Sequence, residues 1–553
     1  MKRSVIVLAT AIIFNFQLST FNSLSAQNDK NFEIAKNIEI FANVYKTLNT
    51  NYVDEVDPGK AIKTAIDAML ASMDPYTNYY PESDMEDVKM QMLGQYGGIG
   101  SLIHQEGEKH FIAEPFEGMP ADLAGLKAGD RILAVNGEST EGKKTTDVSN
   151  AMRGQAGTNV TLTLERDGKT FDVTLTRKEI HMPNVPYSGM LEGNIGYIRL
   201  SEFTQEAAKN VREAFLALKR SHPDLKGVIL DLRGNGGGLM NEAIDIVNIW
   251  VKSGEVVVEQ KGKVAARNQK HRTTHAPDDT DIPVAVLIDG SSASASEIVS
   301  GSLQDLDRAV IIGERSFGKG LVQNILPMPY NNQMKVTVSK YFIPSGRCIQ
   351  AIDYSHRDQN GRASKVPDSL KTAFQTRNGR TVYDGFGIEP DVEVEIAPSS
   401  LVTVALYNKF LFFQYANKFV KEHPSIPPAS EFRITDEIYN DFITFLSDKS
   451  YEYTTYTERL FEEMHRVAKE ENYIDEINQQ LDQLEETFKK AKKDDLMRNR
   501  EDISRYLRDE ILVRYYYQKG RIEGSLVDDP DVLKAIEVLS NRDEYNKILK
   551  GAK

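Results

Sequence analysis

The fold class is decided by residues 227–251, which read GVILDLRGNGGGLMNEAIDIVNIWV. The stretch from Gly227 to Leu232 is apolar over most of its length, which predicts a strand buried on both faces of a sheet. A glycine-rich turn follows, and the apolar residues between Leu239 and Val251 then predict a helix. This order of strand, turn and helix is typical of an α/β domain.

The same alternation continues on both sides of this stretch. Strands are expected at 196–200 and 284–288, and a second helix is expected at 297–306. The rhythm runs through residues 181–397, which we therefore expect to form an α/β core of βαβ units.

The regions around this core differ from it in pattern. Residues 30–93 carry apolar side chains at three- and four-residue spacings, which predicts helices. Residues 94–180 contain short alternating segments and a hairpin signal at Asp167–Gly168, and should form a β-rich domain. Residues 398–553 should form a helical extension, in which an apolar stripe from Ile474 to Phe488 either packs against the protein itself or forms a coiled coil.

The N-terminus has the layout of a secretory signal peptide. Lys2 and Arg3 precede an apolar run from Val5 to Phe16, and small residues lead up to Ala26. We expect residues 1–26 to be removed and the protein to be exported to a bacterial periplasm. The alternative is a retained membrane anchor, for which the apolar run is short.

The composition limits the chemistry and the partners. The 553 residues carry a formal net charge of −14 without a long basic stripe, which argues against nucleic acid and anionic membrane surfaces as partners. Cys348 is the only cysteine, which excludes an intramolecular disulfide and a cysteine-based metal cluster. His271 and His275 share a helix-like spacing in an expected loop, and we expect no metal site there.

The glycine-rich turn is the first candidate for chemistry. Its glycines, Gly234 and 236–238, let backbone N–H groups approach an anion or a developing oxyanion, and the next helix favours negative charge at its start. The turn lacks the Gly-Lys-Ser/Thr ending of a nucleotide P-loop. On its own it is equally compatible with a phosphate loop or a plain turn.

A serine-rich turn and a glycine-flanked lysine are the other two candidates. Residues 291–297 read SSASASE, where a serine can project its hydroxyl clear of the sheet or, as Ser292 or Ser296, can cap the next helix. Lys319 lies between glycines, where burial would lower the pKa of its ammonium group and make it a general base; the alternative is a solvated lysine. If this stretch is a strand, Lys319 and Gln323 share a face.

Taken together, these segments resemble the carboxyl-terminal processing peptidases, also called tail-specific proteases, which are serine peptidases with a Ser–Lys dyad. The matching motifs are SASASEI at 292–298, GERSFGKG at 313–320, Gln323, Asp231-Leu232-Arg233 with its glycines, and GIEPDV at 387–392. The resemblance implies a crotonase-like core with an inserted PDZ-like domain and no metal or organic cofactor.

The resemblance also implies roles for individual residues. Ser294, the middle serine of its motif, is the implied nucleophile, Lys319 is the general base, and Gln323 orients the lysine. The backbone N–H groups of Gly238 and Ala295 are the implied oxyanion hole.

The PDZ-like domain precedes the core. Residues 96–100 look like its carboxylate-binding loop, and residues 124–133 look like its central signature. Successive N–H groups at Gly97, Gly98, Ile99 and Gly100 would hold a C-terminal carboxylate, and the bound peptide would add a strand to a sheet edge. The expected partners are therefore proteins or peptides bound through their C-termini, with a second copy of the chain or an adaptor protein as further candidates.

The expected activity is endoproteolysis in or near the C-terminal region of a substrate. One rival is a catalytically silent PDZ scaffold, against which the joint presence of serine, lysine and glutamine counts. Another is an acyl-thioester hydrolase with a similar oxyanion hole, which the PDZ signature disfavours. Asp305 matches an aspartate that some family members also use, so it is a candidate auxiliary residue, although it could simply end a helix.

Overall fold

The computed structural model describes residues 30–84, 94–359 and 361–551, so the expected signal peptide lies outside the described residues. The chain divides into two compact units, one containing the residues up to Glu82 with Asn324–Thr337 and the other containing Ser83–Gln323 with the residues from Val338 onward. Within the described ranges, no helix combines the length and the apolarity needed to cross a membrane.

The first unit begins with helices, as expected, and then forms a strand. A helix spans residues 30–51, and α2 (Pro58–Ala71) follows it. β1 (Asn78–Tyr80) pairs antiparallel with the first residues of β18 (Gln333–Phe342). The expectation of a helical region is therefore wrong at β1, whose three residues form a strand by pairing with β18.

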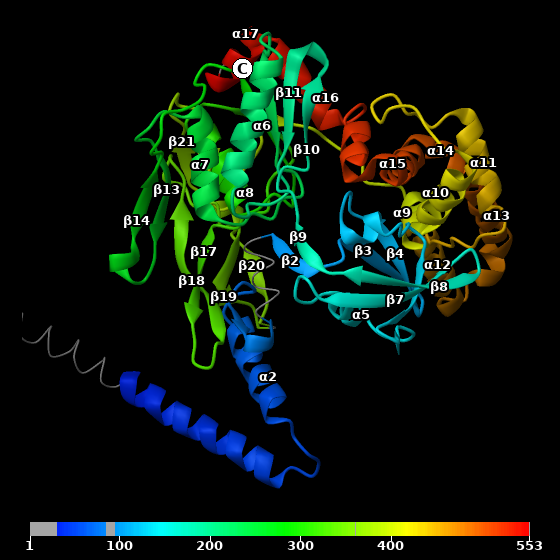
Figure 1. Ribbon diagram of the computed structural model, residues 1–553, viewed down its shortest axis with the longest axis horizontal. Helices are drawn as coiled ribbons and strands as arrows, with labels where there is room; N and C mark the ends of the chain where they lie inside the picture. The colour runs from blue at the N-terminus through cyan, green and yellow to red at the C-terminus, as the bar shows by residue number, and fades with distance from the viewer. Residues whose placement is uncertain (1–29, 85–93, 360, 552–553) are drawn as a thin grey trace, which may run out of the picture. The chain divides into compact units, whose positions relative to one another are not determined.

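A six-stranded sheet is the centre of the second unit (Figure 1). In spatial order its strands are β10 (Tyr187–Leu191), β11 (Ile195–Arg199), β12 (Gly227–Asp231), β15 (Val284–Ile288), β16 (Val310–Gly313) and β23 (Val392–Glu393). β10 is antiparallel to β11, and the other neighbouring pairs are parallel. Between the parallel strands the chain forms α6 (Ala207–Ser221), α7 (Met240–Trp250) and α8 (Ala295–Asp305). The expected βαβ units and the two fully buried strands, β12 and β15, are confirmed.

Alternate residues of the central strands pack against helices on opposite faces of the sheet. Val228 and Leu230 of β12 join a cluster with α6, α7 and α8, whereas Ile229 between them packs with α16 (Pro530–Ser540) and α17 (Arg542–Leu549). The last two helices of the chain thus cover the second face of the core. Both helices lie within the expected helical extension, residues 398–553, and pack on the core.

Residues 95–181 form the expected β-rich domain. Its antiparallel sheet has the order β3 (Ser101–Glu106), β4 (Lys109–Pro115), β5 (Arg131–Val135), β7 (Asn159–Arg166) and β8 (Lys169–Thr176), with β6 (Glu138–Ser139) beside β5. β7 and β8 are the expected hairpin. β2 (Gln95–Gly98) pairs with β9 (Lys178–His181), and the helices of the domain are α4 (Pro120–Leu123) and α5 (Thr145–Met152).

The core carries additional β-structure. β13 (Val256–Lys261) pairs with β14 (Gln269–Arg272) and with the last residues of β18, which also pairs with β17 (Leu321–Pro327). The stretch expected to be loop or insertion contains two short hairpins, β19 (Ile352–Arg357) with β20 (Ala363–Lys365) and β21 (Ala373–Gln375) with β22 (Thr381–Tyr383).

The helical extension has its own apolar core. Its helices are α9 (Leu401–Asn408), α10 (Leu411–Glu422), α11 (Asp436–Leu446), α12 (Tyr456–Glu470), α13 (Ile474–Lys493), α14 (Asp495–Arg498) and α15 (Arg500–Ser525). α13 is the helix with the expected apolar stripe. It packs on α12, where the rings of Phe461 and Phe488 lie 5.5 Å apart, so the stripe serves packing within the protein.

Candidate active site

Two loops meet at the carboxyl ends of the adjacent parallel strands β12 and β15. The Ala293 N–H donates to the Asn235 carbonyl at 3.0 Å, and the Ser296 hydroxyl donates to the same oxygen at 2.8 Å. The Ser292 hydroxyl donates to the Leu232 carbonyl at 2.9 Å. Ser292 and Ser296 are therefore buried ties between the two loops, and the interpretation of either serine as a helix cap is wrong.

Ser294, the serine between them, is the N-cap of α8 and has a strained backbone. Its φ of 57° and ψ of −109° are rare for a residue with a side chain. The residue is half-buried between Ala293 and Ala295, and its carbonyl accepts a hydrogen bond from the Tyr341 hydroxyl at 3.1 Å. A sharp strand-to-helix turn of this kind exposes a nucleophilic hydroxyl at the start of a helix.

The glycine-rich turn lies directly against this serine. A Cβ on Gly237 would approach Ser294 Cβ to 2.8 Å and the Ala295 nitrogen to 2.9 Å, and one on Gly238 would overlap the Phe203 carbonyl. Both glycines have positive φ, 102° and 147°. Among the described residues, the N–H groups of Gly238 and Ala295 have no protein acceptor, so both can donate to a bound oxyanion.

The buried carboxylate of Glu297 joins the serine turn to the lysine loop. Its Oε2 accepts the backbone N–H of Ser294 at 2.8 Å and that of Lys319 at 2.9 Å. Its Oε1 accepts the Gly318 N–H at 2.7 Å and the Ser316 hydroxyl at 2.5 Å. Burial raises the pKa of Glu297, and these four hydrogen bonds oppose that shift. Glu297 is not among the site residues predicted from the sequence, although its position three residues after Ser294 is the spacing of a capping box.

Lys319 and Gln323 lie on one short segment. Lys319 is half-buried between two glycines. Neither glycine position has room for a side chain, because a Cβ on Gly318 would overlap Ala351 and one on Gly320 would lie 2.8 Å from the Gln350 nitrogen. Gln323 is the third residue of β17, and it is also half-buried. Because β17 starts at Leu321, Lys319 precedes the strand, and the condition for a shared strand face is not met.

Asp305 is not brought to this site. It ends α8, and an 11-residue helix separates it from Ser294 by about 15 Å. Its carboxylate pairs with the buried guanidinium of Arg347 at 2.9 Å and accepts the Ser345 N–H at 2.9 Å. Asp305 therefore fixes the 345–347 segment, and the structure gives it no contact with the Ser294 turn.

The expected carboxylate loop divides into two parts. Gly97 and Gly98 lie in β2, paired with β9, and a Cβ on Gly97 would overlap the Gly154 carbonyl. The Ile99 side chain is 3% exposed and packs in the core of the domain, so only its backbone is available to a bound carboxylate. The N–H groups of Ile99 and Gly100 have no acceptor in the described part of the chain, and β3, which follows them, is an edge strand.

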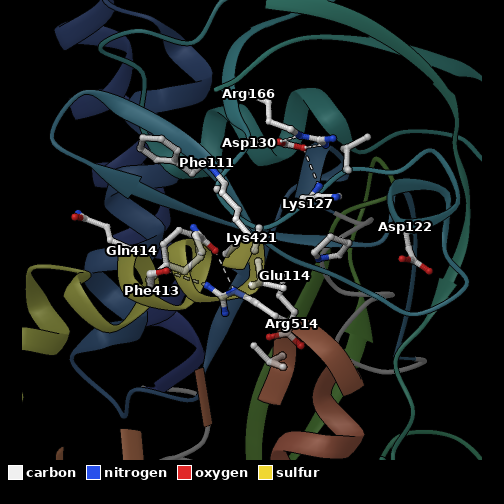
Figure 2. Close-up of a pocket in the computed structure, with 18 of the residues that line it drawn as sticks. Phe111, Glu114, Asp122, Lys127, Asp130, Arg166, Phe413, Gln414, Lys421 and Arg514 are labelled. Atoms are coloured by element: carbon white, nitrogen blue, oxygen red, sulfur yellow. Dashed lines mark hydrogen bonds and ion pairs between the residues drawn. The ribbon is translucent and has the colours of Figure 1, made fainter. Parts of the chain in front are cut away.

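The β-rich domain packs on the helical extension around a pocket of about 730 Å³ (Figure 2). Across this contact the Tyr517 hydroxyl donates to Asp122 at 2.8 Å, and Arg521 pairs with Glu114 at 2.7 Å. Lys421 of α10 pairs with Asp167 in the hairpin turn. Figure 2 shows Phe413, Gln414 and Arg514 of the helices lining the pocket together with Phe111 and Asp130 of the domain. The domain is thus fixed by ion pairs and hydrogen bonds to the helices.

Comparisons with known proteins agree with this architecture. The model of Peptidase family S41 matches residues 194–355, and a PDZ domain model matches residues 111–166. The C-terminal helical domain of a probable PDZ-protease matches residues 402–539, and the N-terminal domain of the activating protease CtpB matches residues 9–84.

Individual relatives cover most of the chain. It is 36% identical over 359 residues to a carboxy-terminal-processing protease of Bartonella bacilliformis, a match that spans 64% of this chain and 81% of the relative. It is 31% identical over 429 residues to a probable CtpA-like serine protease of Staphylococcus aureus, which spans 75% and 82%. A solved structure of the photosystem II D1 C-terminal processing protease is 25% identical and covers 64% of this chain and 92% of that chain, with a TM-score of 0.35.

The α/β core, the PDZ domain and these relatives define a serine peptidase. The chain belongs to peptidase family S41, among the carboxy-terminal-processing proteases.

Proposed function

We propose that this peptidase is an endopeptidase that cleaves proteins in or near their C-terminal regions, with Ser294 as the nucleophile and Lys319 as its general base. The observation that carries the proposal is the Glu297 oxygen that accepts the backbone N–H of both residues. The strained turn at Ser294 supports the same role, because strain of this kind persists where the surrounding structure holds a functional group in place.

In the proposed reaction, neutral Lys319 takes the proton of the Ser294 hydroxyl as Oγ attacks the carbonyl carbon of the scissile peptide bond. The N–H groups of Gly238 and Ala295 stabilise the oxyanion of the tetrahedral intermediate. When the C–N bond breaks, Lys319 returns the proton to the leaving amine. Water then attacks the ester carbonyl of the acyl-enzyme while Lys319 accepts a proton from it. The bond between the carbonyl carbon and Ser294 Oγ breaks, Lys319 returns the proton to Oγ, and the product leaves with a new C-terminal carboxyl group.

Gln323 is proposed to orient the amine of Lys319. Support comes from its place in β17, which begins directly after the Lys319–Gly320 turn, and from its half-buried position. Burial of the lysine would favour the neutral amine that a general base requires.

The PDZ domain is proposed to capture the C-terminus of the substrate. The N–H groups of Ile99 and Gly100 would bind the terminal carboxylate, and the peptide would extend the sheet along the free edge of β3. Gly97 and Gly98 would contribute by letting β2 pack closely on the neighbouring backbone, since a Cβ on Gly97 would overlap the Gly154 carbonyl.

Three wider assignments belong to the same proposal. The order of βαβ units supports a crotonase-like core. The N-terminal sequence supports export to the periplasm with cleavage near Ala26, and a mature protein that starts with Met1 would contradict it. A homo-oligomer or an adaptor protein as partner is the third assignment. Asp305 is not proposed to act in the reaction, because its carboxylate contacts Arg347 and Ser345 instead.

A cleavage assay tests the proposal against a silent PDZ scaffold. The protein is incubated with an unstructured substrate that ends in apolar residues, and the products are identified by mass spectrometry. We expect new C-termini with the wild type and with the control Ser291→Ala, whose side chain is exposed in the same turn, and none with Ser294→Ala. Binding of the substrate without cleavage by the wild type would establish the scaffold instead.

A further inference from the structure

Arg233, which opens the glycine-rich turn, contacts carboxylates from two distant parts of the chain. Its Nη2 donates to Asp231, at the end of β12, at 2.7 Å. Its Nη1 donates to Asp529 Oδ1 at 2.9 Å and to Asp531 Oδ2 at 2.8 Å. A loop of the active site is therefore tied to the C-terminal segment that includes the start of α16.

Asp529 and Asp531 are themselves held firmly. Asp529 is the N-cap of α16 and accepts the N–H groups of Asp531 and Val532 at 3.0 and 3.1 Å. Asp531 is 1% exposed, and α16 buries its apolar face on β12, β15 and β16. Both carboxylates thus belong to a rigid element of the core, at the helix end where negative charge is favoured.

The loop after Arg233 has little backbone stiffness of its own and is held by hydrogen bonds, including the two that the Asn235 carbonyl accepts from Ala293 and Ser296. From Gly234 to Gly238 every residue but Asn235 is glycine, the residue that restricts the backbone least. The start of the loop is anchored by the Arg233 side chain and by two further hydrogen bonds. The Arg233 carbonyl accepts from Arg199 at 2.6 Å, and the Gly234 N–H donates to the Asp289 carboxylate at 2.9 Å. Because Gly237 lies against Ser294, a shift of Arg233 would displace the backbone beside the nucleophile.

We propose that Asp529 and Asp531 are positioning residues of the active site, which hold the Arg233 guanidinium and through it the loop that presents the Gly238 N–H. The inference rests on the proposed function, because it gives the two carboxylates a part in the reaction of Ser294. Both act through Arg233 and not on the reacting atoms.

The charges around Arg233 make this arrangement sensitive to pH. Burial raises the pKa of Asp531 to about 6; the Arg233 charge opposes this shift, and the neighbouring carboxylates of Asp529 and Asp231 reinforce it. Burial also acts to raise the pKa of Asp231, but Arg233 and Arg199 hold that pKa well below its usual range. Of Asp531 and Asp231, Asp531 therefore loses its charge first as the pH falls.

The test compares Asp529→Asn and Asp531→Asn with Asp528→Asn, a control in the same segment whose carboxylate pairs with Arg508. With a peptide substrate, we expect each of the first two variants to lower kcat by about 10- to 100-fold while KM changes by less than about threefold. The control should keep the wild-type kcat. Circular dichroism and thermal melts establish that the compared proteins are folded.

The dependence of kcat on pH provides a second readout, which would be the same in wild type and variants if the two carboxylates had a purely structural role. The kcat of the wild type should fall as the pH is lowered through about 6, since Asp531 then becomes neutral. This inflection should be absent in Asp531→Asn and present in Asp528→Asn. Should Asp531→Asn fail to fold, Asp529→Asn and the wild-type profile decide the question, and a wild-type profile without the inflection counts against the inference.

Failure of this inference differs from failure of the proposed function. Wild-type kcat in both Asn variants, together with an inactive Ser294→Ala, overturns the positioning role and leaves the dyad intact. A lower melting temperature with unchanged kcat does the same, because the carboxylates would then stabilise only the fold. Cleavage by Ser294→Ala overturns the proposed function itself.

Discussion

The backbone N–H groups of Ser294 and Lys319 donate to the same atom, Oε2 of Glu297, at 2.8 and 2.9 Å. Neither the serine turn nor the lysine loop can move away from the other without breaking a hydrogen bond to a buried carboxylate, and an unpaired buried charge is costly. The distance between the proposed nucleophile and its base is therefore set by the backbone and by one side chain that takes no part in the proton transfer.

Replacing Glu297 with glutamine should damage both stability and activity. The amide NH₂ would face two of the four donors that the carboxylate now accepts from, so we expect a loss of about 1–3 kcal/mol in the free energy of unfolding. Activity should fall by about 100-fold, because the serine and lysine loops lose their common acceptor. Urea denaturation and kcat measurements, with exposed Glu314→Gln as the control, check both numbers. A Glu297→Gln protein equal to wild type in both would contradict this account of the residue.

The glycine-rich turn offers a matched pair of substitutions. Gly237→Ala should abolish most activity, because its φ of 102° disfavours a side chain and the new Cβ would lie 2.8 Å from Ser294 Cβ. Gly236→Ala should be nearly silent, since no atom lies within 4 Å of the position its Cβ would take. The measurement is kcat/KM for both variants on one peptide. Equal losses of kcat/KM in the two variants would show that the close contact between Gly237 and Ser294 does not matter for activity.

The contact between the PDZ domain and the helical extension should weaken in acid. The His104 ring stacks on Phe410 with centroids 4.4 Å apart, and burial lowers the pKa of His104 to about 4. The charges that also face it are Glu510, which opposes the shift, and Arg514 and His110, which reinforce it.

The direction of the pH effect on stability follows from the pKa of His104, which in the folded state lies below the ordinary value of 6.5. The histidine contributes its full stability above pH 6.5, and this contribution is lost as the pH falls through about 4. The melting temperature should therefore drop between pH 7 and pH 4.5 by more in the wild type than in His104→Phe, which keeps the stacking and cannot titrate. An identical drop in both proteins, with exposed His181→Phe as the control, would exclude His104 as the cause.

Capture of chain ends should depend on the terminal charge of the substrate. Charge-assisted hydrogen bonds to the N–H groups of Ile99 and Gly100 are worth about 1.5–3 kcal/mol each, so amidating the C-terminus of a peptide should lower kcat/KM by about tenfold or more. The loss should appear in KM if the domain only tethers the substrate, because tethering binds ground state and transition state equally. A peptide in which an internal Asp is changed to Asn controls for the lost charge. Equal kcat/KM for the free acid and the amide would rule out a carboxylate reader at this loop.

Much of the core could be predicted from the sequence because its signals are local. The apolar runs at 227–232 and 284–288 and the turns after them are contiguous in the chain, and the structure has buried strands and loops at these places. The strand β1 could not be predicted in the same way, since its three residues become a strand only by pairing with β18, more than two hundred residues later. Ser292 and Ser296 were also beyond local reasoning, because their hydroxyl partners lie on a loop that only the fold brings near.

The contribution of the C-terminal helices was hidden for a related reason. α16 has the ordinary pattern of an amphipathic helix, and nothing in that pattern shows which surface its apolar face covers. Only the fold brings Asp529 and Asp531 to Arg233. The packing of Ile99 toward the core of its domain is likewise set by neighbours such as Ala121, whose N–H donates to the Ile99 carbonyl at 2.8 Å.

The central claim, that Ser294 and Lys319 act as one catalytic unit, is tested most directly by a double-mutant cycle on peptide cleavage. We expect Ser294→Ala and Lys319→Ala each to remove nearly all of kcat, with melting temperatures close to wild type, and the double variant to be scarcely worse than either, because residues that act together are strongly non-additive. Near-normal cleavage by either single variant, or losses that simply multiply in the double variant, would contradict the dyad.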